Sequence, residues 1–142
     1  MLVEFLTAIK QRIGVLKPTR WFMSDDAEQY FNSWKGVFGA EGTTKLLCAW
    51  HVDRAWRNAL KEHVTTKEAQ LEVYHQLRVL LMENEESAFR VLLQQFLSYI
   101  DTYEKDFYDY FKAHYCNRLE QWASCFRVGM VVNTNMFLES FH

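Results

Sequence analysis

The sequence predicts a helix-dominated α/β fold, and three observations lead to that class. Hydrophobic residues make up 49% of the 142 residues, so a core can form, while one proline and five glycines leave few helix breakers. Apolar side chains recur every three or four positions along most of the chain, as in helices that pack on one side. Two short apolar runs without this period are typical of buried strands. The length is that of a single domain.

The first part of the chain is predicted to alternate helices with short strands. The expected elements are a helix over 2–16, a strand over 19–24, a helix over 27–38 and a strand over 45–50. Gly14 and Pro18 end the first helix, because glycine weakens a helix and proline cannot continue one. Two strands do not form a stable sheet by themselves. Either the pattern conceals further strands, or part of the sheet lies outside this chain.

The rest of the chain is predicted to be a mostly helical block. One helix carries an apolar stripe from Val52 to Leu60. Three more helices follow, with stripes over 73–81, 89–100 and 103–114. No run of apolar residues approaches the length that a membrane span requires.

The charge balance argues against a self-sufficient DNA-binding domain. The 16 basic and 18 acidic residues give a net charge of −2, whereas such domains usually carry a basic excess that neutralises phosphates. Any contact with DNA therefore requires a local basic face. The three cysteines are widely spaced and odd in number, which is typical of reduced thiols. Since no signal sequence is predicted, we expect an intracellular protein, nuclear or cytoplasmic, without a membrane partner.

Three short motifs carry residue types that are suited to chemistry. They are Met23-Ser24-Asp25-Asp26, then Leu47-Cys48-Ala49-Trp50-His51-Val52-Asp53-Arg54-Ala55-Trp56, and last Asn133-Thr134-Asn135-Met136-Phe137-Leu138-Glu139-Ser140-Phe141-His142. In this order they resemble Mutator-like transposases, in which an Asp follows a core strand, a Cys-x-x-His pair leads into a helix and an Asn-rich segment precedes Glu-Ser-Phe. The resemblance runs from about residue 20 to the C-terminus.

The resemblance implies a partial RNase H-like fold over residues 1–142 that holds two divalent metals. Asp25 would be the second catalytic, metal-binding acid of the family and Glu139 the third. The first acid is expected on strands that precede Met1, so the first strands of the fold are missing here. Carboxylates are hard oxygen ligands, so Mg²⁺ or Mn²⁺ is the cofactor expected in the intact family domain. Residues 64–117 would be a helical insertion.

The same resemblance implies an ancestral reaction and its partner. Two metal ions can activate a water or a 3′-hydroxyl for attack on a phosphodiester and stabilise the leaving oxygen. The reaction would be DNA strand cleavage and transfer, and the partner of the full-length protein would be DNA at the transposon ends. Self-association through the helical insertion is a further expected interaction. With two of three acids, this chain is expected to be inactive by itself.

Simpler roles compete for the same residues. An Asp-Asp pair after a strand commonly caps the next helix, a role that suits Asp26, and Glu139 alone resembles any surface acid. Cys48 and His51 would suit zinc, but a structural zinc site needs about four ligands. We therefore favour a buried Cys48 and a His51 that orients groups near the metal site, and we do not expect zinc.

The helix after the second strand offers candidate DNA contacts. Arg54 and Arg57 could meet phosphate, and a solvated helix face is an equally weighted alternative. Trp50 and Trp56 are predicted to lie in the core rather than to stack on bases. At the level of the whole chain, the alternative to a transposase fragment is a domesticated, non-enzymatic helical module that binds a protein. A third hypothesis is a decayed reading frame without function.

Overall fold

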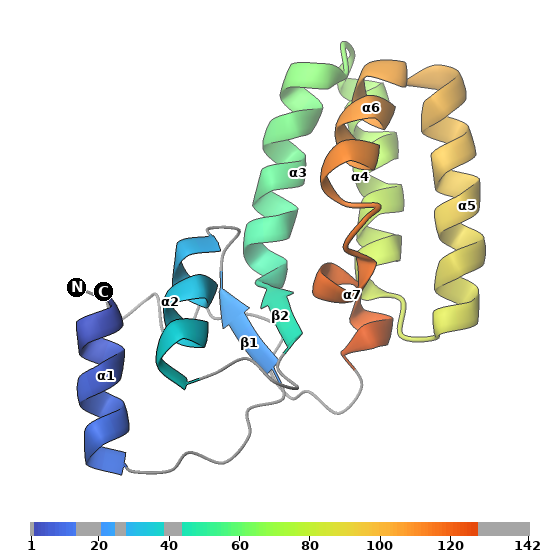
Figure 1. The fold of residues 1–142 in the computed structure, drawn as a ribbon. Helices are drawn as coiled ribbons and strands as arrows, with labels where there is room; N and C mark the ends of the chain where they lie inside the picture. Colours follow the sequence, from blue (N-terminus) through green and yellow to red (C-terminus); the bar gives the residue numbers. More distant parts are fainter. Residues whose placement is uncertain (1, 14–20, 25–27, 39–43, 128–142) are drawn as a thin grey trace.

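The computed structural model describes residues 2–13, 21–24, 28–38 and 44–127 (Figure 1). Its elements in chain order are α1 (Leu2–Ile13), β1 (Trp21–Ser24), α2 (Glu28–Phe38), β2 (Thr44–Leu47), α3 (Ala49–His63), α4 (Lys67–Met82), α5 (Glu86–Tyr103), α6 (Lys105–His114), α7 (Leu119–Trp122) and the 3₁₀ helix η1 (Ser124–Phe126). Helices dominate, as the sequence predicts. No helix in the described ranges is long and apolar enough to cross a membrane.

β1 and β2 form a parallel two-stranded sheet, and α2 is the crossover between them. Parallel neighbours cannot be joined by a tight turn, so the chain leaves β1, forms a helix and returns in the same direction. The register pairs Trp21 with Thr44 and Ser24 with Leu47. The carboxyl ends of both strands therefore lie side by side. α1 packs on α2 next to this βαβ unit (Figure 1).

The second strand ends earlier than the sequence predicts. Leu47 is its last residue and α3 begins at Ala49, so the end of the predicted strand over 45–50 is helical. Cys48 is extended, with φ −64° and ψ 125°, and its carbonyl accepts the N–H of Val52 at 3.0 Å to start the helical ladder. A short apolar run cannot distinguish a strand from the first turn of a buried helix, which is why the boundary was misplaced.

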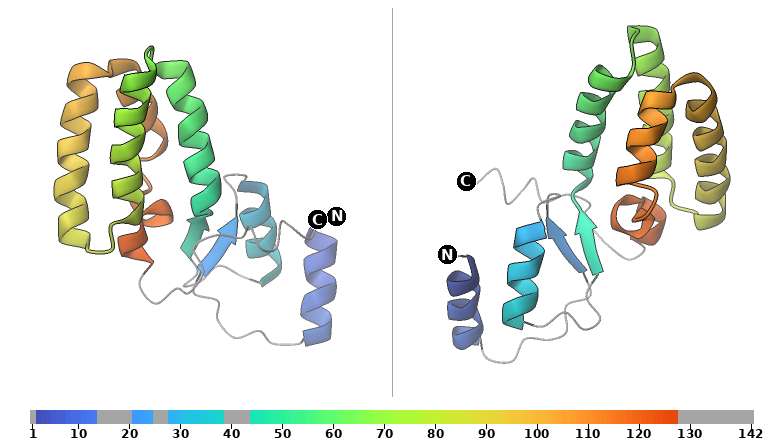
Figure 2. Two further views of the ribbon diagram at one scale, coloured as in Figure 1. Left: turned by 180° about the vertical axis from the view of Figure 1, so that it is seen from behind. Right: turned by 45° about the horizontal axis from the view of Figure 1, so that its top comes forward.

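Helices α3 to α6 form an up-and-down bundle beside the sheet (Figure 1). Views from two other directions also show the bundle on one side of the sheet (Figure 2). Aromatic rings fill much of its core. Trp56 is fully buried and lies 6.0 Å from Phe111 between ring centroids, while Phe96 lies 5.2 Å from Phe111. The prediction that Trp56 belongs to the core is confirmed. Burying large rings supplies much of the stabilisation of such a bundle.

The segment from α7 to Arg127 connects the bundle to the sheet. Trp122 is buried 5.2 Å from Trp56 between ring centroids, and its indole N–H donates to the carbonyl of Tyr115 at 3.0 Å. Arg127 is buried and donates to the carbonyls of Leu47 and Gln121. Burial lowers the pKa of Arg127 to about 10, so it stays cationic at neutral pH. The chain after α7 is thereby held against the end of β2.

Candidate functional site

The Cys-x-x-His motif lies at the junction between β2 and α3. Cys48 is 0% exposed and precedes α3, and His51 lies in the first turn of that helix. The predicted burial of Cys48 and the predicted strand-to-helix junction are both confirmed. Ser24 and Leu47 are register partners at the ends of their strands, so the next residues in the sequence are Asp25 and Cys48.

The two predicted metal-binding acids lie outside the described residues. Asp25 follows β1 in the sequence, and Glu139 falls within residues 128–142. Their expected approach to each other therefore stays a prediction. Within the described part of the chain, no group of three or more His, Cys, Asp or Glu side chains could hold a metal ion.

The three cysteines, Cys48, Cys116 and Cys125, are free thiols. Cys125 is buried and Cys116 is half-buried. Burial is the main cause that raises the pKa of both thiols above the ordinary value of 9.0. At neutral pH these two side chains are therefore protonated, which makes them poor nucleophiles and poor metal ligands.

A groove between α3 and α4, here called the α3–α4 groove, has polar, charged and aromatic side chains in its lining. Its cavity volume is about 590 Å³. Its lining residues are Trp50, Arg54, Arg57, Asn58, Leu60, Lys61, Lys67, Gln70, Leu71 and Tyr74. Four of them are cations and none is an Asp or a Glu. The groove therefore offers apolar surface surrounded by positive charge.

Helical spacing explains why the cations gather there. Arg54, Arg57 and Lys61 are three and four positions apart on α3, which places them along one face of the helix. Lys67 adds a charge from the first turn of α4. The prediction singled out Arg54 and Arg57 and overlooked Lys61, although the same spacing could have revealed it. Lys67 required the fold, because it belongs to the next helix.

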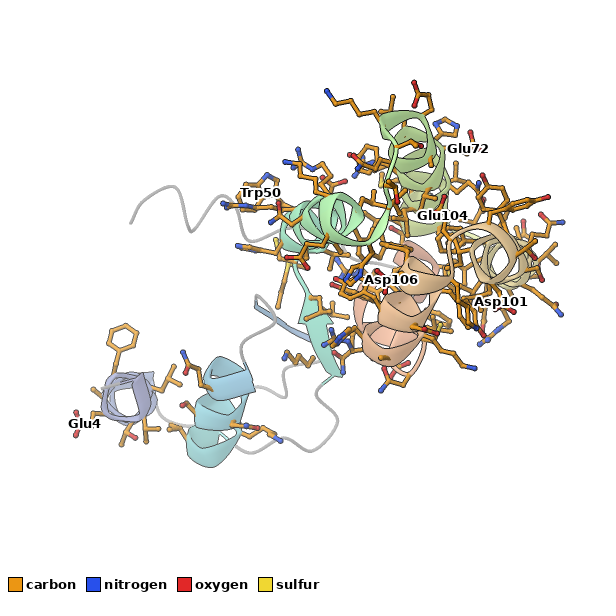
Figure 3. All side chains as sticks on the ribbon, turned by 90° about the horizontal axis from the view of Figure 1, so that it is seen from above. Glu4, Trp50, Glu72, Asp101, Glu104 and Asp106 are labelled. Atoms are coloured by element: carbon orange, nitrogen blue, oxygen red, sulfur yellow. The ribbon has the colours of Figure 1, made fainter. Side chains whose placement is uncertain are left out.

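Trp50 lines the groove and is not a core residue, contrary to the prediction. Its exposed fraction is 37%, and the guanidinium carbon of Arg54 lies 5.4 Å from its ring centroid. Figure 3 shows Trp50 on the side of α3 that faces away from α5 and α6. Trp50 and Trp56 are six positions apart, so about 100° of rotation per residue leaves them about 120° apart around the helix. Trp50 and Trp56 therefore cannot both face the bundle core.

Asp53 holds two of the groove residues in place. It is 8% exposed and accepts from the Tyr74 hydroxyl at 2.8 Å, and it pairs with Arg57 at 2.9 Å and with Arg78 at 3.2 Å. Burial, followed by the hydrogen bond to Asp53, raises the pKa of Tyr74. Because two guanidinium groups already neutralise it, Asp53 is not a spare metal ligand. It links α3 to α4 and orients Arg57 and Tyr74.

Comparison of the chain with protein-family models, with curated proteins and with solved structures found no match. The function proposed below therefore rests on the chain's own motifs and geometry.

Proposed function

We propose that this chain is a fragment of a transposase catalytic core of the Mutator-like type, with metal-dependent DNA strand cleavage and transfer as its ancestral reaction. The observation that carries the proposal is the register of β1 and β2. The residues that follow the last register pair in the sequence are Asp25 and Cys48, which belong to the first and second motifs. In open α/β sheets, functional sites form outside the carboxyl ends of neighbouring parallel strands.

The proposal assigns a role to each motif. Asp25 and Glu139 would hold Mg²⁺ or Mn²⁺ through carboxylate oxygens, and the bound ions would supply the polarisation that phosphodiester attack requires. His51 would orient groups at the strand ends, and buried Cys48 would anchor the start of α3. The partial RNase H-like fold is part of the proposal, with residues 64–117 as its helical insertion. In that arrangement the α3–α4 groove contacts DNA.

A metal titration tests the site. Mn²⁺ at tenfold above its Kd should stabilise the folded chain by about 1.4 kcal/mol, which raises the Tm by a few degrees. An Asp25→Asn/Glu139→Gln variant should lose this shift. Asp26→Asn is the matched control, because it removes a neighbouring charge while asparagine still caps a helix well. A metal-dependent shift of equal size in the first variant would contradict the site assignment.

A second candidate is the domesticated, non-enzymatic helical module that binds a protein. The observation in its favour is apolar surface on α4 and α5, where Val79, Met82 and Val91 are exposed. Such a module requires no metal, so the absence of any Mn²⁺-dependent shift in the parent chain would favour it over the transposase proposal. DNA cleavage by the parent chain with Mn²⁺ would contradict the expectation that it is inactive by itself.

A further inference from the structure

We infer that the α3–α4 groove binds an unpaired nucleic-acid strand, with a base stacked on Trp50 and phosphates bound by the cations around it. The inference rests on the proposed DNA-directed function and specifies which form of nucleic acid this surface takes. Four features carry it: the shape of the groove, its apolar lining, its charge and the exposed indole.

The shape and lining of the groove suit an unpaired nucleotide better than a duplex. The cavity volume of about 590 Å³ falls within the range of roughly 300–1,000 Å³ that compact ligands occupy. Leu60, Leu71 and Tyr74 contribute apolar lining. A duplex keeps its bases stacked inside and presents a convex phosphate surface, which cannot fill an apolar hollow. An unpaired strand presents flat, apolar base faces that can.

Trp50 provides a stacking platform at this groove. An exposed indole leaves apolar ring surface in water, and a base that stacks on it removes that surface from solvent. Stacking of this kind tolerates any sequence, because every base has a π-face. The Arg54 guanidinium, 5.4 Å from the Trp50 ring centroid, is close enough to add a cation–π contact or to reach an adjacent phosphate.

The charge of the groove selects a polyanion. Arg54, Arg57, Lys61 and Lys67 line it, and no carboxylate is among the described lining residues. Asp53 offsets part of the charge of Arg57 from beneath, and the side chain of Arg57 is still about half exposed. A peptide of Asp and Glu alone would match the charge but has no flat ring system to cover Trp50. The observations therefore favour a nucleic-acid strand over an acidic protein.

Fluorescence anisotropy with the full chain in EDTA tests the inference. The probes are a labelled oligothymidylate of about 12 nucleotides, an abasic strand of equal length, a DNA hairpin duplex and polyglutamate. We expect the oligothymidylate to bind most tightly. Tighter binding of the duplex, equal binding of the abasic strand, or equal binding of polyglutamate would each overturn the inference, the last in favour of an acidic protein partner.

Matched variants separate stacking from charge. Trp50→Leu should weaken oligothymidylate binding about tenfold or more and change abasic binding about twofold or less, while Trp50→Phe should retain most of the affinity. Tyr103→Leu, which removes an exposed ring on α5, is the control and should change nothing. Equal losses in Trp50→Leu for both strands would contradict a stacking role. Unchanged circular dichroism of the variants excludes unfolding as the cause.

The salt dependence tests the cations. Lys61→Gln/Lys67→Gln should reduce the slope of log K against log salt by roughly 1.4, since each phosphate contact to a single strand contributes about 0.7. Lys105→Gln/Lys112→Gln on α6 changes the net charge equally and should leave the slope unchanged. Equal effects of the two pairs would overturn the assignment of the groove. Because no metal is present, this outcome is independent of the Mn²⁺ titration that tests the proposed function.

Discussion

Single residues in the second motif have roles that depend on the face of α3 to which they belong. Trp56 points into the bundle core, Trp50 lines the α3–α4 groove, and Asp53 lies buried against α4. Asp53 binds Arg57 on its own helix and Arg78 and Tyr74 on the next. A buried carboxylate is stable only when such partners replace its lost hydration. Asp53 is therefore a structural residue that also organises the groove.

Replacing Asp53 with asparagine should destabilise the fold by about 2 kcal/mol. The change removes the charge that neutralises Arg57 and Arg78 and weakens the bond from Tyr74, while the partial exposure of both arginines limits the loss. Urea denaturation measures the effect. Glu86→Gln is the control, because its pair with Arg90 is exposed on both sides and contributes about 0–1 kcal/mol. Equal losses in both variants would show that Asp53 has no special role.

The separation of Trp50 and Trp56 onto different faces of α3 was predictable from the sequence, whereas the partners of Asp53 were not. Helical geometry alone places Trp50 and Trp56 on different faces of α3, but it does not say which face meets the bundle. Tyr74 and Arg78 come from α4, 21 and 25 positions further along the chain than Asp53. No local pattern connects residues at such separations, so only the packing of α3 on α4 reveals the network.

At the scale of secondary-structure elements, periodicity predicted the long helices well, and local capping determines where they begin. α4 begins after Thr66, whose hydroxyl accepts the N–H of Ala69 at 3.2 Å. This bond satisfies one of the backbone donors that every helix leaves unpaired in its first turn. Glu68 in that turn adds a favourable interaction with the helix dipole. α4 carries Lys67 into the groove, so its start matters for the site.

Replacing Thr66 with alanine should reduce the free energy of unfolding by about 1 kcal/mol, because the cap to Ala69 is lost. The matched control is Thr65→Ala, since Thr65 is also exposed but lies one residue outside the cap position. We expect that control to stay within about 0.5 kcal/mol of the parent chain. The test is the shift in the urea midpoint. A larger effect at Thr65 than at Thr66 would contradict the assignment of the cap.

The short elements at the end of the described chain could not be predicted. α7 and η1 contain four and three residues, which is too few to display a helical period. Their positions result from Trp122, which inserts among bundle aromatics, and from Ser124, whose hydroxyl donates to the carbonyl of Leu81 at 2.6 Å. Both interactions join residues that are distant in the sequence. Tertiary packing, and not local helix propensity, therefore determines where α7 and η1 form.

For the whole molecule, a net charge of −2 conceals a segregation of charge. Cations line the α3–α4 groove, whereas Asp101, Glu104 and Asp106 lie around the connection between α5 and α6 (Figure 3). The net charge indicates that any DNA contact requires a local basic face. The fold forms a basic face at the α3–α4 groove by placing Lys67 beside the cations of α3. Net charge could not reveal this, because it sums over all faces of the molecule.

Alkaline pH should destabilise the folded chain. Burial raises the pKa of Cys116, Cys125, Tyr74 and Tyr99 above their ordinary values of 9.0 and 10.0. The unfolded chain therefore releases these protons at lower pH than the folded chain. Above about pH 9 the folded state binds more protons, so the free energy of unfolding falls as the pH rises. Urea midpoints between pH 7.5 and about pH 10 measure the decline.

The cysteines and Arg127 determine the pH range in which this decline is measured. A Cys116→Ala/Cys125→Ala variant keeps only the tyrosine contribution, so its decline should begin about one pH unit later. Arg127 acts in the opposite direction, because burial lowers its pKa to about 10, and its effect begins only above that value. The measurement is therefore restricted to lower pH. Midpoints that stay constant or rise between pH 8 and pH 10 would contradict the assigned directions.

The sequence by itself determined the class of the fold, the order of its long helices and strands, and the position of Cys48 and His51 at a strand-to-helix junction. These follow from local periodicity and from residue types, both of which act over a few positions. Tertiary structure decided the parallel register of β1 and β2, the insertion of Trp122 into the core, the charge network of Asp53 and the assembly of the α3–α4 groove. Each of these joins residues far apart in the chain, and only the packing of whole elements brings such residues into contact.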